Sequence, residues 1–330
     1  MLDSAETPAA WIALQERGGP LNGISTIASR ETLPEGPILQ ALDARGRRHY
    51  LLPLPSESKL NDNASAGVKL LGFQLEGKPF LDIRCDIPRL NGVFDDLADD
   101  LIAAARQEPE HIPEACKEAL DSWRTLLRSV RNSNVAETAV VGVLAELMIV
   151  VEIVSRGGPN RIDVWTGAEH RRHDIRNGNA ALEVKCSKAN TSRRIQIHGL
   201  TQLEPPENGS LHLVFVRLEA VTGGEISVPR LVSRLRDLGV APQTVLETLD
   251  SRGIAPGTAD HLEFSHRETM VYEVGEGFPA LTTSNFPMSE IPPGLDSVKY
   301  EIDLDRVTTE PLDDTAMDQL LQRLASHESA

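Results

Sequence analysis

The chain has 330 residues, of which 40% are hydrophobic and 25% charged, as in an ordinary globular protein with room for a sizeable core. Its formal net charge of −16 argues against a generic nucleic-acid coat protein, because such proteins are basic. We see no signal peptide and no apolar run of the roughly 20 residues that span a bilayer. The three cysteines are far apart and form no metal-type pair, so we expect reduced thiols and a cytoplasmic protein that does not contact a membrane.

The first 133 residues combine strand-like and helical patterns. Residues 1–90 alternate short apolar runs with Gly and Pro, and the runs within 41–55 and 68–87 predict strands of a β-rich N-terminal module. Apolar residues at helical spacing then predict two helices within 91–133, which form a helical connector.

A third helix is predicted over 134–158, and its middle is apolar on nearly every side, so it should be buried. The region 134–220 forms the predicted core of an α/β fold, in which this helix is followed by strand-like pieces at 161–165, 173–175, 181–187, 193–198 and 211–220. Residues 221–330 alternate helical and strand-like segments and predict a C-terminal α+β extension.

A tight hairpin is predicted around residues 177–179, Asn-Gly-Asn, because Gly and Asn tolerate the positive φ that such turns require. If the last two of these residues form the loop, Asp174 faces Glu183 across the hairpin. If the first two form it, Asp174 faces Ala181 and Glu183 lies two residues away. Both registers remain open, and in both the two carboxylates project from the same face.

Lys185 shares that face with Asp174 and Glu183, whereas Leu182 and Val184 point into apolar packing on the other. Two carboxylates within about 5 Å repel each other and need a compensating positive charge. A hard divalent cation supplies one, and Mg²⁺ is held by one or two carboxylates together with substrate phosphate oxygens. A lysine alongside would neutralise a phosphate or help to position an attacking water. The pattern therefore predicts phosphodiester hydrolysis.

Glu146 interrupts the apolar run at 139–151 of the predicted buried helix, and burying an unpaired carboxylate is costly. Gly142, one turn earlier on the same face, leaves room for something to approach. A third metal ligand, direct or through water, would account for this glutamate. The alternative is a helix-edge acid at a rim.

Asp174 followed by Glu183-Val184-Lys185 resembles the D-x(n)-E-x-K signature of the PD-(D/E)XK nuclease superfamily, with His173 where the motif has Pro. The segments "GVLAEL", "VWTGAEHRRHDI", "ALEVKCS" and "TQLE" look like the bacterial family known as PD-(D/E)XK motif proteins. The similarity extends over most of the chain, including "DSWRTLL", "GFPAL" and "VKYEIDL". Its members tend to lie in defence or restriction gene neighbourhoods, beside DNA methyltransferases and ATPases.

The resemblance implies a restriction-endonuclease-like αβββαβ core and a Mg²⁺-dependent deoxyribonuclease, for which Mn²⁺ can substitute. It gives the signature positions to Asp174, Glu183 and Lys185, the helical acid to Glu146, and the polar residue after the third strand to Gln202. Asp174, Glu183 and Glu146 would hold the metal. Unless it borders the site, Gln202 would be an ordinary residue at a helix N-terminus.

Basic residues gather around the candidate site between 161 and 198, on a chain that is acidic as a whole. Such a local patch fits phosphate-backbone binding, although it could also be a solvated face. The residues that we predict to bind DNA are Arg171, Arg172, Lys188, Arg193 and Arg194. His170 and His173 flank two of them, and we expect surface histidines rather than metal ligands there.

The leading hypothesis is a metal-dependent DNA endonuclease of a restriction or phage-defence system, with ATPase and methyltransferase partners. Because double-strand cutting needs two active sites, we also expect a homodimer. The alternative is a catalytically idle subunit that uses the nuclease fold for DNA binding or for assembly with a defence ATPase. Cleavage of RNA or of single strands would use the same site, and the sequence does not give the target sequence or its methylation.

Overall fold

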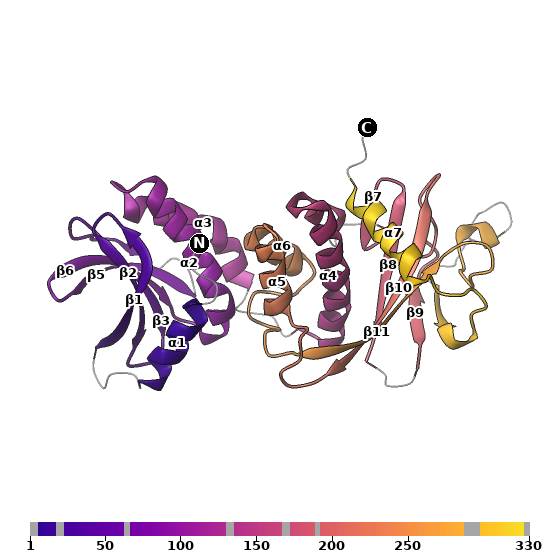
Figure 1. Cartoon of the computed structure of the whole chain (residues 1–330), viewed down its shortest axis with the longest axis horizontal. Helices are drawn as coiled ribbons and strands as arrows, with labels where there is room; N and C mark the ends of the chain where they lie inside the picture. Colours follow the sequence, from indigo (N-terminus) through magenta and orange to yellow (C-terminus); the bar gives the residue numbers. More distant parts are fainter. Residues whose placement is uncertain are drawn as a thin grey trace. The chain divides into compact units, whose positions relative to one another are not determined.

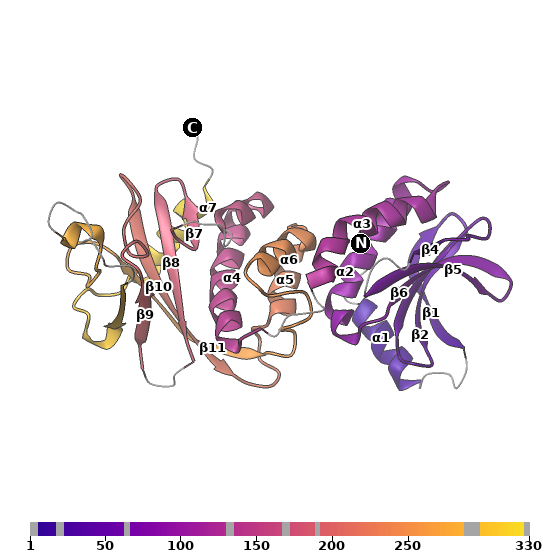
Figure 2. The same cartoon turned by 180° about the vertical axis from the view of Figure 1, so that it is seen from behind.

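The structure is a computed structural model, in which the chain forms two compact units (Figures 1 and 2). Unit 1 comprises Met1–Asn134 with Ala255–Thr258, and unit 2 comprises Val135–Ile254 with Ala259–Ala330. The structure describes residues 6–17, 23–62, 67–129, 135–166, 172–188, 192–286 and 298–326.

Unit 1 is built on a six-stranded antiparallel sheet with the strand order β1-β2-β3-β6-β5-β4. Its strands are β1 (Ile24–Leu33), β2 (Gly36–Asp43), β3 (Arg48–Pro53), β4 (Asn61–Asp62), β5 (Val68–Leu75) and β6 (Lys78–Cys85). The two-residue turn Glu76-Gly77 joins β5 to β6, and both of its residues have positive φ, as the tightest hairpins require.

The helices of unit 1 are α1 (Glu6–Glu16), α2 (Asn91–Gln107) and α3 (Ile112–Ser129). Three aromatic rings join α1, β3 and α2, since the Trp11 and Phe94 rings each lie with their centroids 5.5 Å from that of Tyr50. The sequence predicts α2 and α3 from their apolar spacing. It does not predict α1, where Trp11 is buried but the neighbouring Ile12 is 55% exposed, so that the apolar residues follow no helical period.

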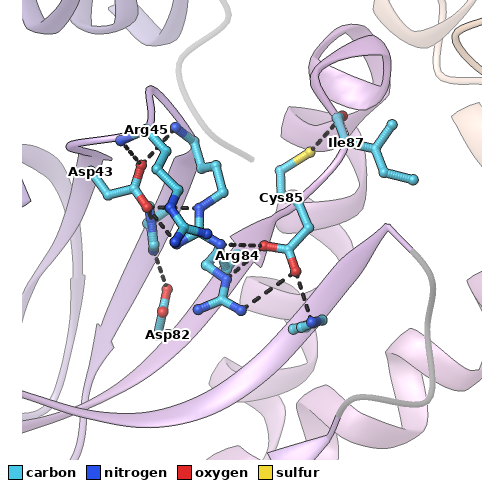
Figure 3. Close-up of polar contacts among 10 residues, drawn as sticks. Asp43, Arg45, Asp82, Arg84, Cys85 and Ile87 are labelled. Atoms are coloured by element: carbon cyan, nitrogen blue, oxygen red, sulfur yellow. Dashed lines mark hydrogen bonds and ion pairs between the residues drawn. The ribbon is translucent and has the colours of Figure 1, made fainter. Parts of the chain in front are cut away.

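A polar network lies on the opposite face of this sheet (Figure 3). His49 precedes Tyr50 in β3, and successive side chains of a strand point to opposite faces. The Nδ1 atom of His49 lies 2.8 Å from Oδ1 of Asp82, and Arg47 donates from Nε to Oδ2 of Asp43 at 2.7 Å. Burial raises the pKa of Asp43, but its hydrogen bonds, those from Arg47 foremost, outweigh burial and hold the pKa below its ordinary value.

Unit 2 has a mixed four-stranded sheet with the order β11-β10-β8-β7. Its strands are β7 (Ile175–Asn177), β8 (Ala180–Ser187), β10 (Ser210–Ala220) and β11 (Phe264–Glu273). Strands β8 and β10 are parallel, and the other neighbours are antiparallel.

Helix α4 (Glu137–Gly157) runs between this sheet and the helices α5 (Val228–Asp237) and α6 (Pro242–Ser251) (Figures 1 and 2). By length and composition α4 could span a bilayer, with a mean hydropathy of 2.1 over its most apolar window, although we expected no such run. That window is 67% buried within the protein, as in the core helix of a globular domain. It is the one helix of this kind among the residues that the structure describes.

A second layer covers the other side of the sheet. Strand β9 (Arg194–His198) lies across the sheet from α4 and pairs with β12 (Lys299–Asp303) in an antiparallel ladder (Figure 1). Ile195 and Ile302 of this pair pack in one apolar cluster with Leu213 of β10. Helix α7 (Asp314–Ala325) contacts α4 and β7. Short 3-10 helices lie at Pro88–Leu90, Pro159–Val164, Thr283–Asn285 and Leu304–Arg306.

Two predictions about the core are wrong. The segment 161–165 is not a strand: Pro159–Val164 is a 3-10 helix, started by a proline at its first position, and Trp165 only forms an isolated bridge to Ile175. In addition, the described segment 199–209 contains no helix between β9 and β10, so the αβββαβ order implied by the superfamily is not found within 134–220. What remains is a mixed α/β unit in which a buried helix leads into a hairpin and further strands.

The grouping of the predicted segments follows from packing. Segments 1–90 and 91–133 lie together in unit 1, because α2 and α3 contact strands of the antiparallel sheet. Segments 134–220 and 221–330 lie together in unit 2, because β11 pairs with β10 and α5 packs on α4.

Candidate active site

The candidate site starts at the β7–β8 hairpin. The register pairs Ile175 with Leu182 and leaves a two-residue loop that begins at Gly178, whose φ is 55°. This is the first of the two predicted registers. Continued by one residue, it sets Asp174, which directly precedes β7, opposite Glu183.

Asp174 is anchored across the hairpin. Its Oδ2 atom accepts a hydrogen bond of 2.8 Å from the backbone N–H of Val184. Burial raises the pKa of Asp174 above its ordinary value, although this hydrogen bond and the charges of Lys185 and Arg252 oppose the rise. The carboxylate is thus held in place at an electrostatic cost.

Glu183 is the most deeply buried of the site's acids, with 2% of its surface exposed. Burial, and next the charge of Asp174, raise the pKa of Glu183 to about 8. The ammonium of Lys185 lies 2.6 Å from Oε1 of Glu183 and opposes this rise. The glutamate and lysine of the E-x-K pattern therefore form a partly buried ion pair on the face that the alternation predicts.

Gln202 borders this ion pair. Its Oε1 atom lies 3.4 Å from Nζ of Lys185 and accepts a hydrogen bond of 2.8 Å from the backbone N–H of His198. The expectation that Gln202 starts a helix is wrong, since it lies in the turn that follows β9. A glutamine in that turn can restrict the positions open to the lysine.

Glu146 projects from α4 with only 8% of its surface exposed. Its Oε2 atom accepts hydrogen bonds from Nε1 of Trp165 at 2.8 Å and from Nη1 of Arg252 at 2.5 Å. Burial, and then the charge of Asp174, raise the pKa of Glu146 to about 7, whereas Arg252 and Trp165 lower it. The glutamate is therefore not an acid at an open rim but a buried group, one of whose carboxylate oxygens accepts two hydrogen bonds.

Arg252 is the functional candidate that the sequence did not reveal. It lies just after α6, donates from Nη2 to the carbonyl of Thr166 at 2.5 Å, and stacks 4.8 Å from the centroid of the Trp165 ring. The contact joins residues 106 positions apart, and no spacing rule links Arg252 to Glu146. The sequence offers only a weak signal for it, an arginine at the end of a predicted helical segment.

The three carboxylates and their partners leave an unbalanced charge. Lys185 pairs with Glu183, Arg252 pairs with Glu146, and Asp174 receives a neutral N–H. With all three acids ionised, two cations would leave one negative charge in a largely buried place, and burial together with the repulsion between the acids accordingly raises the pKa of Glu146 and Glu183. A cation is the natural complement.

The family model DUF4420, described as "Putative PD-(D/E)XK family member", matches residues 8–305. The chain belongs to the DUF4420 family. No curated protein and no solved structure matches it. The family description agrees with the signature found at Asp174, Glu183 and Lys185.

The site of this DUF4420 chain offers oxygen donors to a divalent metal. Among the described residues, no three His, Cys, Asp or Glu side chains are arranged as a metal-binding group. Mg²⁺ needs fewer protein ligands, because one or two carboxylates with water and substrate phosphates suffice. Asp174 and Glu183 are such hard oxygen donors. Burial first, and repulsion by Asp174 second, raise the pKa of Glu183, and a cation would relieve the repulsion. The two-carboxylate set therefore fits, whereas the carboxylate of Glu146 is already bound by Arg252 and Trp165.

The basic residues predicted to bind DNA have carboxylate partners in this DUF4420 chain. Arg171 lies outside the described residues. The nitrogen-to-oxygen distances of the others are 3.3 Å for Arg172–Glu204, 2.8 Å for Lys188–Glu137, 2.9 Å for Arg193–Glu268 and 3.5 Å for Arg194–Glu301. Their charge is thus partly neutralised within the protein, which the sequence spacing could not show.

The expectation of surface histidines is wrong for His173, while His170 lies outside the described residues. His173 is 4% exposed, and its Nε2 atom lies 3.0 Å from the carbonyl oxygen of Glu204. Burial lowers the pKa of His173. In the position where the superfamily motif has Pro, this histidine ties the start of the hairpin to the segment that follows Gln202.

Proposed function

We propose that this DUF4420 protein is a divalent-metal-dependent DNA endonuclease of a restriction or phage-defence system. The observation that carries the proposal is the ion pair between the buried Glu183 and the partly buried Lys185, with Asp174 anchored beside it across the hairpin. A purely structural role would be met more cheaply by apolar residues, because burying ion pairs brings little net stability.

Each residue has a proposed part in the reaction. Asp174 and Glu183 would hold the metal, which when bound supplies Lewis-acid polarisation of a phosphoryl oxygen and offsets negative charge. Lys185 would orient or deprotonate the attacking water and stabilise the charge that develops on the phosphoryl group. Gln202 would limit the movement of the lysine ammonium. The products expected from the superfamily are a 5′-phosphate and a 3′-hydroxyl.

Glu146 receives an assisting role in this proposal. Because Trp165 and Arg252 already bind its carboxylate, we assign it to assistance through water rather than to direct metal binding. Arg252 would keep the glutamate ionised in its buried position and fix its orientation. We also propose a cytoplasmic location, a homodimer, and association with an ATPase and a methyltransferase of the same system.

The test uses purified protein on methylated and unmethylated plasmid DNA with Mg²⁺ or Mn²⁺. Asp174→Asn and Lys185→Ala should each reduce cleavage by at least about 100-fold, because each removes a group that acts on the reacting phosphate. Asp163→Asn is the matched control, since Asp163 is 59% exposed and its carboxylate pairs with Arg161. Full cleavage by the Asp174→Asn protein would refute the assignment.

A second candidate is a catalytically idle subunit that assembles with a defence ATPase or binds DNA. The neutralised basic residues favour it, because a surface of ion pairs suits a protein partner as well as a phosphate backbone. Calorimetry separates the two candidates. Absence of Mg²⁺ and Mn²⁺ binding to the intact protein would favour the idle subunit.

A further inference from the structure

A cavity of about 320 Å³ lies in unit 2, apart from the three carboxylates. It is lined by Arg193, Arg217, Leu218, Glu219, Arg267 and Glu268. Half of these lining residues are arginines, and their planar guanidinium groups match the geometry of carboxylates and phosphates. A cavity of this size can hold a small ligand or one unit of a polymer.

The cavity opens on the same face of the sheet as the candidate site. In the parallel ladder between β8 and β10, Lys185 is the partner of Phe215, and Ser187 is the partner of Arg217. Side chains two residues apart in a strand share a face, so Arg217 lies on the face of Lys185. The guanidinium of Arg217 confirms this, because it lies 5.8 Å from the ring centroid of Phe215. From strand geometry, the Cα atoms of Lys185 and Arg217 are roughly 8 Å apart.

A β-bulge brings the second arginine into the cavity. In the ladder between β10 and β11, Arg217 pairs with Glu268 but the next residue, Leu218, pairs with His266. Arg267 is therefore the extra residue of the bulge. In a regular strand Arg267 and Glu268 would point to opposite faces, yet both line the cavity. Bulges of this kind re-aim side chains beside functional sites.

The arginines are held in place by carboxylates that they share. Glu268 bridges two of them, with distances of 2.6 Å to Nη2 of Arg217 and 2.9 Å to Nη2 of Arg193. Arg193 also contacts Asp305 at 2.7 Å, and Arg267 pairs with Glu219. Hydrogen bonds from Arg193, foremost, lower the pKa of Glu268. Two carboxylates line the cavity beside the three guanidinium groups, and Asp305 is a third carboxylate that pairs with Arg193. Each guanidinium has five N–H donors.

We propose that this arginine cavity binds a backbone phosphate of the nucleic-acid substrate, next to the phosphate that is cut. The inference rests on the proposed function for the position of the cut phosphate near Lys185. The separation of roughly 8 Å between the two Cα atoms is short enough for the two cationic side chains to contact phosphates of the same strand. The cavity would fix the register of the strand and carry no sequence preference, as phosphate contacts do.

The experiment measures DNA binding by fluorescence anisotropy in EDTA, over a series of salt concentrations. Arg267→Gln should raise the Kd by about 5- to 10-fold and reduce the salt slope by about 1, as expected for one lost phosphate contact. Arg267 is 52% exposed, so the substitution should leave folding intact. Arg230→Gln is the matched control, because Arg230 is 50% exposed and does not line the cavity. Arg267→Lys keeps the charge and should retain the wild-type slope.

A scan with single methylphosphonate linkages locates the contact. One neutral linkage next to the cut site should weaken binding by the wild-type protein and have no further effect on Arg267→Gln. A Kd and slope of Arg267→Gln equal to those of Arg230→Gln, or a scan without a position-specific effect, would overturn the inference even if the plasmid is cleaved. Conversely, a positive result with no cleavage in Mg²⁺ or Mn²⁺ would leave the cavity assigned and refute the proposed function. Absence of DNA binding at any salt concentration would overturn both.

Discussion

Replacing Glu183 with glutamine removes a charge that the folded protein buries at a cost. The pKa of Glu183 is about 8 in the folded protein, whereas a glutamate without interactions has a pKa of 4.5. Burial is the first cause of this rise, and the charge of Asp174 is the second. The folded state therefore binds the proton more tightly than the unfolded state. Stability from this group is fully present below about pH 4.5 and is lost as the pH rises toward 8.

The size of the loss follows from linkage. Each pH unit between the two pKa values costs about 1.4 kcal/mol, so the free energy of unfolding should fall by about 3 kcal/mol from pH 5 to pH 8. Glu183→Gln has no proton to lose and should abolish this part of the fall. The ion pair with Lys185 forms only when Glu183 is ionised, so its contribution is already contained in the pKa of Glu183 and is lost together with the charge.

Urea unfolding of the full chain in EDTA, followed by circular dichroism at several pH values, measures the effect. Other groups titrate in the same range, and comparison of the two proteins cancels their contribution. Glu152→Gln serves as the matched control, since Glu152 is 53% exposed on the same helix as Glu146. Mg²⁺ at pH 8 should restore stability to the wild type and less to Glu183→Gln. Parallel pH curves for the wild type and Glu183→Gln would refute the reasoning.

Three further outcomes are expected. Arg252→Met leaves the buried Glu146 carboxylate without its cation and should lower the free energy of unfolding by about 3–5 kcal/mol in urea unfolding. The double variant with Glu146→Gln should recover most of this loss. An unchanged free energy of unfolding in the single variant would show that the pair is not needed. Gly209→Ala places a Cβ against the backbone oxygen of Asn179 and should lower the melting temperature. Gly275→Ala is the control, because its added Cβ meets open space. Equal melting temperatures of the two variants would contradict the packing. Removal of divalent metal by EDTA should stop plasmid cleavage and its return should restore it, and cleavage that persists in EDTA would argue against the metal.

The parts of the site that lie close together in sequence could be predicted, because local rules govern them. The Asn-Gly-Asn turn and the two-residue period of strands place Asp174, Glu183 and Lys185 on one face whichever register the hairpin adopts. Which of the two registers forms is seen only in the structure, where Asn177 pairs with Ala180. The apolar run of α4 similarly predicted a buried helix, with Glu146 as its one anomaly.

The parts that depend on distant contacts could not be predicted. Arg252 reaches Glu146 only because α6 and α4 lie in the same unit, and no pattern in either helix requires it. The helix expected at Gln202 is a different error, because the local chemistry of the following residues argues against it. Pro205 and Pro206 lack the N–H that a helix interior needs, and they end any helix that would begin there.

The charges of the site also bear on the choice between a nuclease and an idle subunit. A protein that only bound DNA would gain nothing from three buried carboxylates near the phosphate backbone, because they would repel it and lower the stability of the fold. A divalent cation reverses both effects, since it relieves the repulsion among the acids and attracts phosphate oxygens to the site. Buried charges that weaken a fold are most easily understood where function requires them. The electrostatics of Glu183 and Asp174 therefore favour metal-dependent chemistry over simple binding, and the paired basic residues limit how strongly the protein can hold DNA without the metal.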